Sequence, residues 1–222
     1  MNIILEKLNQ DEQVSVARFN DGEVGALVGD LRRTFKGEQS VDNTLISGLK
    51  RALDYRSKSY YIGYPCPECY PTYHNYVKQK IGNYERQILA TFATNHNYKN
   101  FLEELEGVIW GEWVLVSDKD VNFGGPHKYV SCPSENAMSQ AEKIIEDVLR
   151  FEEKIVILTC GAASRYIASE LDQMGRSALD FGSIFDPHKG KLRKNGKAIN
   201  THVWEGFTNK AAFCGICNHA GI

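Results

Sequence analysis

The chain has 222 residues, of which 42% are hydrophobic, so it can bury a substantial core as one large domain. Its 26 basic and 28 acidic residues leave a formal net charge of -2, which gives no global reason to expect a polyanionic partner. No apolar run approaches the roughly eighteen residues that a membrane span requires. The N-terminal stretch MNIILEKLNQDEQ also lacks the apolar core of a signal peptide. We therefore expect a soluble, cytoplasmic protein whose six cysteines are thiols or metal ligands, not disulfides.

Helical and strand patterns alternate in the first half of the chain. Apolar residues at positions 3, 4 and 8 predict a short amphipathic helix over residues 1–10, and VSVARF at 14–19 alternates as a strand does. Residues 43–53 place their apolar side chains on one helical face, with Asp42 or Asn43 as the N-cap. SYYIGY at 59–64 predicts a strand that stops at Pro65. Helical spacing then runs from Tyr73 to about Leu105, with a break near TNHNYKN at 94–100.

The second half of the chain predicts the core of a parallel sheet. GVIWGEWVLVSD at 107–118 indicates one or two strands, and residues 134–151 indicate a helix capped by Ser134. Residues 154–182 then form a buried strand, a small-residue turn, an amphipathic helix and a second strand, which is a βαβ unit. We predict a single α/β domain over residues 1–222, with a doubly wound, mostly parallel, Rossmann-like sheet covered by helices on both faces.

The turn TCGAAS, at 159–164, follows the first strand of that unit. Ligands of such sheets bind beyond the carboxyl ends of the strands, and small residues there let backbone N–H groups approach a phosphate. Close packing of helix on sheet is the alternative explanation for the same residues. The full spacing of the dinucleotide-binding fingerprint is missing, which counts against a nicotinamide cofactor.

The segment RFNDGE, at 18–23, places Asp21 and Glu23 two residues apart directly after a strand pattern. On an extended backbone the two carboxylates would face the same side, with Gly22 leaving the space between them open. Converging carboxylates suit a hard divalent cation that also bridges phosphate oxygens, and Arg18 precedes them on the same strand. A turn with solvated acidic side chains is the alternative.

ARFNDGE at 17–23 and VILTCGAASRYIASELDQMGRSALDFGSI at 156–184 together resemble the GT-D type bacterial glycosyltransferase domains, over roughly residues 14–186. The resemblance implies a GT-D-like fold and a hexosyl- or pentosyltransferase in which Asp21 and Glu23 hold Mg²⁺ or Mn²⁺ against the diphosphate of a sugar nucleotide, with Arg18 nearby. It also implies that a further set of residues holds the nucleotide or borders the cleft: Gly161, Ala162, Ser164, Asp180 and Gly182. The sequence departs from the family pattern at Asn20 and in the turn CGAAS.

Sugar transfer with inversion needs a base for the acceptor hydroxyl. The candidates are Asp186, Asp180, His127 and His188, among which the sequence does not discriminate. NFGGPHK at 122–128 suggests a mobile loop with His127 and Lys128 at its tip, or a simple surface turn.

Two Cys-x-x-Cys pairs carry a separate signal. Cys66 with Cys69, and Cys214 with Cys217, provide the four thiolates of a structural Zn²⁺ site, although four unligated thiols, or His219 in place of one ligand, are alternatives. Such an ion would staple a Tyr-rich insertion at 60–76 to the C-terminal segment 187–222. The remaining cysteines, Cys132 and Cys160, are expected to be core thiols.

Aromatic and basic residues leave the acceptor open. The tyrosines of 60–76 suit stacking on sugars or bases, and HKGKLRKNGKAINTH at 188–202 indicates a basic β-hairpin that would contact phosphate or simply face solvent. Three hypotheses follow. The first is a metal-dependent glycosyltransferase that uses a nucleoside-diphosphate sugar and a glycan or protein-linked glycan acceptor. The second has the same donor and a hydroxyl-bearing base in DNA as acceptor, and the third is a non-catalytic, zinc-stabilised module that binds nucleic acid.

Overall fold

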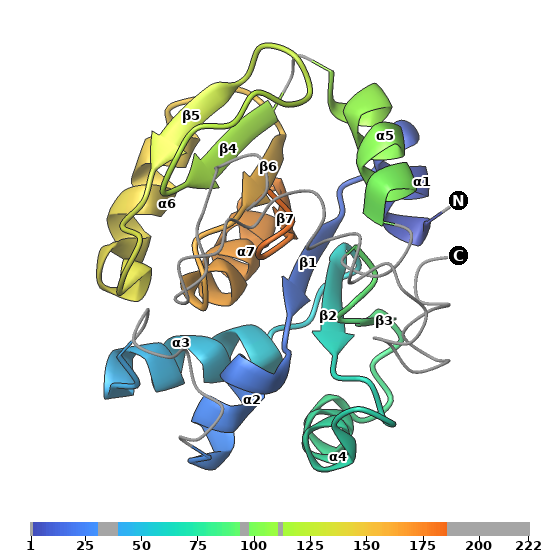
Figure 1. The fold of residues 1–222 in the computed structure, drawn as a ribbon, viewed down its shortest axis with the longest axis vertical. Coiled ribbons are helices and arrows are strands. Elements are labelled where there is room, and N and C mark those ends of the chain that lie inside the picture. Colours follow the sequence, from blue (N-terminus) through green and yellow to red (C-terminus); the bar gives the residue numbers. More distant parts are fainter. Residues whose placement is uncertain (1, 31–39, 94–97, 111–112, 186–222) are drawn as a thin grey trace, which may run out of the picture.

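The structure, a computed structural model, describes residues 2–30, 40–93, 98–110 and 113–185. The strands in this part of the chain are β1 (Ser15–Arg18), β2 (Tyr60–Tyr64), β3 (Gln87–Leu89), β4 (Trp113–Ser117), β5 (Lys128–Ser131), β6 (Ile155–Leu158) and β7 (Ser177–Asp180). They form a seven-stranded sheet in the order β3-β2-β1-β7-β6-β4-β5, and every pairing is parallel (Figure 1). The predicted parallel α/β sheet is therefore confirmed.

Helices cover both faces of the sheet. On the first face, one apolar core unites the buried sides of α2 (Asp21–Val28), α3 (Asn43–Asp54), α4 (Pro71–Ile81), α6 (Ala141–Leu149) and α7 (Ala163–Gln173). On the second face, a separate core contains the buried sides of α1 (Ile3–Asn9) and α5 (Tyr98–Ile109). The helix α7 contacts α3, α6, β1 and β7, so it lies at the centre of the first face.

The direction of each connection explains which face it covers. Connections that step along the sheet toward β3, such as β1 to β2 and β6 to β7, carry their helices on the first face. The connection from β3 back to β4 steps the other way and carries α5 on the second face, as a single crossover hand requires. After β1 the chain turns to the first face. After β7 it turns to the second face, where the side chains of Phe181, Ile184 and Phe185 enter the core. Neighbouring strands that diverge in this way leave a crevice at the carboxyl edge of the sheet.

Several local predictions are confirmed. The helix over the first ten residues is present, and Asp42 caps α3 by accepting a hydrogen bond from the backbone N–H of Leu45 at 2.8 Å. The βαβ unit is present as β6, α7 and β7. Cys132 and Cys160 are buried, as expected of core thiols.

Other local predictions are wrong. Residues 60–76 are no insertion, because Tyr60 and its neighbours form β2, which pairs with β1 inside the sheet, and α4 follows. Ser134 does not cap a helix, since the helical stretch begins at Ala137 as a 3₁₀ turn, η2 (Ala137–Gln140), and continues as α6. The short strand β3 lies within the stretch that was expected to be helical.

Some predictions lie outside the described residues. These concern Cys214, Cys217, His219, Asp186, His188 and the basic hairpin at 188–202. Within the described part of the chain, no helix combines the length and the apolar character needed to cross a membrane.

Candidate active site

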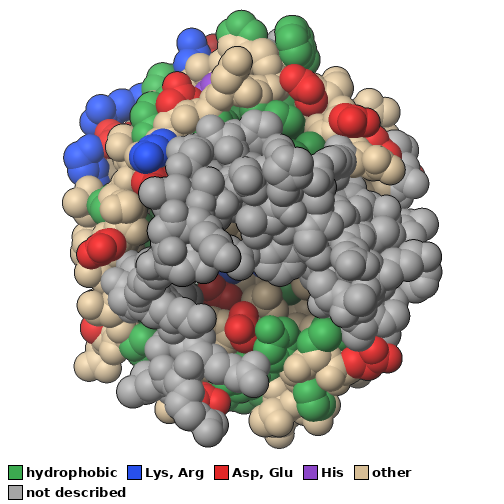
Figure 2. Space-filling model, in the orientation of Figure 1, with side chains coloured by type: hydrophobic (Ala, Val, Ile, Leu, Met, Phe, Trp, Pro, Cys, Tyr) green, Lys and Arg blue, Asp and Glu red, His purple; other side chains and the backbone are tan. Residues whose placement is uncertain are grey.

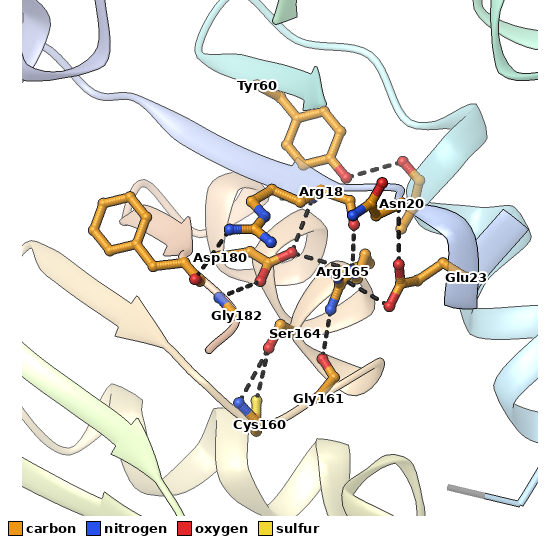
Figure 3. A network of polar contacts seen from close by, with 12 residues as sticks. Arg18, Asn20, Glu23, Tyr60, Cys160, Gly161, Ser164, Arg165, Asp180 and Gly182 are labelled. Carbon is orange, nitrogen blue, oxygen red and sulfur yellow. Dashed lines mark hydrogen bonds and ion pairs between the residues drawn. The ribbon is translucent and has the colours of Figure 1, made fainter. Parts of the chain in front are cut away.

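Arg18 and Asp180 end the neighbouring strands β1 and β7, and the two residues contact each other at the carboxyl edge of the sheet (Figure 3). The backbone N–H of Arg18 donates to Asp180 Oδ2 at 2.9 Å, and Arg18 Nη1 donates to the carbonyl of Phe181 at 3.0 Å. Both side chains are buried, and Arg18 Nε has no hydrogen-bond partner among the described residues. Burial lowers the pKa of Arg18, while the adjacent Asp180 carboxylate opposes that change. A buried guanidinium with an unused donor is a feature that an anionic ligand would complete.

Arg165 joins the segments of the site, and the sequence analysis missed it. From the first turns of α7, its Nε lies 3.1 Å from Asp180 Oδ2 and donates to the carbonyl of Arg18 at 2.6 Å. Its Nη1 donates to the carbonyl of Gly161 at 2.6 Å, and its Nη2 lies 3.1 Å from Glu23 Oε1. Burial alone would lower the pKa of Arg165, but the carboxylates of Asp180 and Glu23 outweigh it and the pKa is raised. The only sequence signal was an arginine directly after the small-residue turn.

The two carboxylates of RFNDGE do not extend from a strand, so that expectation is wrong. They lie in the first turn of α2, where residues two apart point to different sides of the helix. Glu23 is buried, and its Oε2 accepts from the backbone N–H of Asn20 at 3.0 Å while its Oε1 pairs with Arg165. Asp21 is partly exposed, and its carboxylate has no hydrogen bond or ion pair with a described residue. Glu23 therefore supports the site, and Asp21 is the carboxylate that remains open.

Asp21 is the residue through which the chain could hold a divalent cation. Mg²⁺ is usually held by one or two carboxylates together with water and the phosphates of the substrate, so a complete protein cage is not required. Both oxygens of Glu23 are already engaged, Oε2 in a hydrogen bond and Oε1 in an ion pair, and only their remaining lone pairs are available to an ion. Within the described residues no group of three or more His, Cys, Asp or Glu side chains could hold a metal.

The turn after β6 brings a second helix N-terminus to the site. Gly161 has φ +62°, a conformation that other residues adopt rarely, and its carbonyl accepts from Arg165. Ser164 Oγ accepts from the backbone N–H of Cys160 at 3.2 Å. The backbone amides of residues 161–163 have no partners among the described residues. Hydrogen bonds from Cys132 and Ser164 lower the pKa of the Cys160 thiol, although burial opposes them. The predicted phosphate-binding turn thus has its amides available.

Gly182 packs directly against the guanidinium of Arg18. It has φ +55°, and its N–H donates to Asp180 Oδ1 at 3.1 Å. A Cβ at this position would lie 3.1 Å from Arg18 Nη2. The glycine therefore allows the backbone after β7 to approach Arg18, and its place at the border of a ligand cleft stays a prediction.

Two of the candidate bases occupy unsuitable places. Both oxygens of Asp180 are engaged, with Gly182, Arg18 and Arg165, so this residue positions the arginines. His127 directly precedes β5, whose first residue pairs with Val114 near the start of β4, so it lies at the opposite, amino edge of the sheet. It is not at a loop tip, because its ring stacks on Trp113 with centroids 4.4 Å apart.

The first Cys-x-x-Cys pair follows β2. Cys66 is buried and Cys69 is exposed, in the turn that leads into α4. Because the second pair lies outside the described residues, shared zinc ligation stays a prediction.

The fold matches known proteins. Residues 124–200 match a family model described as the glycosyltransferase GT-D fold. A new glycosyltransferase from Streptococcus sanguinis is 20% identical, with a TM-score of 0.63 over 84% of this chain and 82% of that chain. A domain of unknown function 1792, described as having a distinct glycosyltransferase fold, is 17% identical, with a TM-score of 0.66 over 99% of this chain and 88% of that chain. No curated protein matches the sequence. These likenesses establish that the chain has the GT-D fold.

Proposed function

We propose that this chain is a glycosyltransferase that moves a sugar from a nucleoside-diphosphate sugar to a hydroxyl of a glycan. The donor diphosphate binds in the crevice between the carboxyl ends of β1 and β7. The observation that carries the proposal is the buried Arg18, whose Nε has no partner among the described residues, at this crevice of a GT-D fold. A diphosphate oxygen would supply the missing acceptor.

Two helix N-termini add to the attraction for an anion. The helices α2 and α7 both begin at the site, linked by the contacts of Arg165 with Glu23 and Gly161. The partial positive charge at each N-terminus favours phosphate, and the amides at the start of α7 are available as donors. Arg18 and Arg165 supply two positive charges, which Glu23 and Asp180 balance before the donor binds. The chain thus holds a preorganised anion site without excess buried charge.

The reaction requires charge neutralisation on the leaving group. A Mg²⁺ or Mn²⁺ ion held by Asp21 would neutralise the diphosphate as the bond to the anomeric carbon breaks. Arg18 stabilises the same developing charge from inside the protein. The acceptor oxygen forms the new bond to the anomeric carbon and gives its proton to a base. Asp186 and His188 are the proposed candidates for that base, because both follow β7 closely in sequence.

Surface charge favours a glycan over DNA as acceptor. Figure 2 shows acidic side chains scattered over the described residues of this face, while most basic side chains in view gather near β5 and α6. A DNA-binding surface needs a continuous basic stripe, and the described side chains in view on this face do not form one.

Calorimetry and thermal shift with a panel of sugar nucleotides test the proposal. A donor at a hundred times its Kd should add about 2.7 kcal/mol of stability, a rise in Tm of roughly 5–11 °C. Arg18→Lys should weaken donor binding, because lysine keeps the charge but lacks Nε, and exposed Arg51→Lys serves as the control.

Enzymatic turnover gives the second readout. We expect release of nucleoside diphosphate from one sugar nucleotide, slowly in water and faster with a glycan acceptor. Absence of both binding and turnover across the panel would reject the proposed function. Faster turnover with hydroxymethylated DNA than with any glycan would reassign the acceptor.

A further inference from the structure

A second pocket lies at the amino edge of the sheet, away from the crevice. The loop between β4 and β5 returns along the second face of the sheet and meets Trp110, which directly follows α5. Together they line a shallow pocket of about 660 Å³ that is broadly open to solvent. The residues that matter in it are Trp110, Asp120, Asn122, Gly125 and His127.

The walls of this pocket are held by packing and hydrogen bonds. The ring of His127 stacks on buried Trp113, and Trp113 Nε1 donates to the carbonyl of Gly124 at 3.2 Å. Gly125 has φ +70°, and a Cβ there would lie 3.1 Å from the indole of Trp110. The glycine backbone therefore covers one part of the Trp110 ring at van der Waals distance. The pocket is formed before any ligand arrives, which lowers the entropy cost of binding.

Three groups of the pocket remain available to a ligand. The side chain of Trp110 is 64% exposed, so much of its indole is open to solvent. Asp120 Oδ1 accepts from His127 Nε2 and from the backbone N–H of Val121, each at 2.8 Å, while its Oδ2 has no partner among the described residues. The amide of exposed Asn122 likewise makes no hydrogen bond within that part of the chain.

We propose that this pocket binds a neutral saccharide. A pyranose ring has an apolar C–H face, which suits the open indole, and an edge of hydroxyls, which suits a carboxylate oxygen and an amide side by side. Among the described residues that line the pocket there is no lysine or arginine, and the carboxylate of Asp120 repels phosphate, so a nucleotide is disfavoured. The inference depends on the groups of the pocket alone and not on the proposed transfer reaction.

The position of the pocket separates it from sugar transfer. The start of β5 pairs with the start of β4, so the pocket lies at the amino edge of the sheet. The strand β7 runs parallel to β4, with β6 between them, and its last residue, Asp180, therefore lies at the carboxyl edge. The two sites thus occupy opposite edges of one sheet. A saccharide at the amino edge would anchor the protein to a glycan without touching the residues proposed to bind the donor.

Saturation-transfer NMR on the full chain tests the proposal. The probes are cellotriose, maltotriose, lactose and chitotriose, with uridine as the nucleoside comparison. We expect at least one oligosaccharide to bind with a Kd on the order of 1 mM, and Trp110→Ala to weaken it by about tenfold or more. Asn122→Ala, a smaller change on the loop between β4 and β5, should weaken binding of the same saccharide, whereas Tyr76→Ala on α4, on the other face of the sheet, should not.

The outcomes distinguish this site from the crevice. Trp110→Ala should leave donor hydrolysis unchanged, because Trp110 lies at the opposite edge of the sheet from Arg18, and should lower Tm only slightly, because most of its indole is exposed. The proposal is overturned if no oligosaccharide of the panel binds, if binding persists in Trp110→Ala, or if uridine binds and the saccharides do not. Absence of donor hydrolysis in the wild-type chain would reject the transfer function, and saccharide binding at this pocket would still stand.

Discussion

Replacing Glu23 with glutamine should destabilise the fold. If Glu23 were instead a ligand of a surface metal site, the same change would leave stability nearly unaltered. Glu23 is buried against Arg165 at 3.1 Å and caps the N-terminus of α2 through Asn20. Removing one partner of a buried ion pair costs about 3–5 kcal/mol. Asp180 still pairs with Arg165 in the variant, and the amide oxygen of glutamine still accepts from Asn20, so we expect the lower end, about 3 kcal/mol. In a chain of this size that loss lowers Tm by roughly 6–12 °C.

Asp21→Asn is the matched control, two residues away in the same turn. Its carboxylate has no partner among the described residues, so the variant loses only the interaction with the helix dipole, about 0.3–1 kcal/mol. Urea unfolding followed by circular dichroism measures both variants, and the slope with denaturant should stay constant. The reasoning is refuted if Glu23→Gln loses no more stability than Asp21→Asn. The opposite ranking should appear in activity at limiting Mn²⁺, where Asp21→Asn loses the response to metal.

Three further predictions concern backbone, pH and metal. Gly182→Ala should cost about 1–2 kcal/mol in backbone strain, plus a loss of donor affinity through contact with Arg18, whereas Gly175→Ala carries the strain with no atom within 4 Å of its Cβ. Equal donor affinity in both variants would show that contact between residue 182 and Arg18 does not affect donor binding. Burial raises the pKa of Tyr55 to about 12, so the folded state holds the phenol proton more tightly than the unfolded chain. The contribution of this phenol to the free energy of unfolding is complete below about pH 10 and is lost toward pH 12. Urea titrations across that range should show this loss in the wild-type chain and not in Tyr55→Phe. Elemental analysis should find about one zinc per chain and none in Cys66→Ser, and a metal-free wild-type protein would contradict this.

Local chemistry made much of the fold predictable. The cap at Asp42, the helical spacing that follows it and the βαβ unit at 154–182 depend on residues close in sequence, so the pattern alone identifies them. The short strand β3 escaped prediction because three residues inside a helical pattern carry too little periodicity. The segment DGEVGALV was also ambiguous, since its glycines weaken any pattern. It is helical because Glu23 caps the first turn and Val24 packs in the core.

The composition of the candidate site depends on the tertiary structure. Residues at the carboxyl ends of parallel strands converge however far apart they lie in sequence, and this brings Arg165 against Arg18 across 147 positions. A buried arginine on a helix leaves no signal in an amphipathic pattern, so its ion pairs with Glu23 and Asp180 became visible only when α7 was seen packed over β1 and β7. The same parallel topology makes the loop after β4 return to the amino edge, which removes His127 from the crevice. Spacing along the chain singled out the acidic motif and the small-residue turn, and packing of the strands decided which side chains share a site.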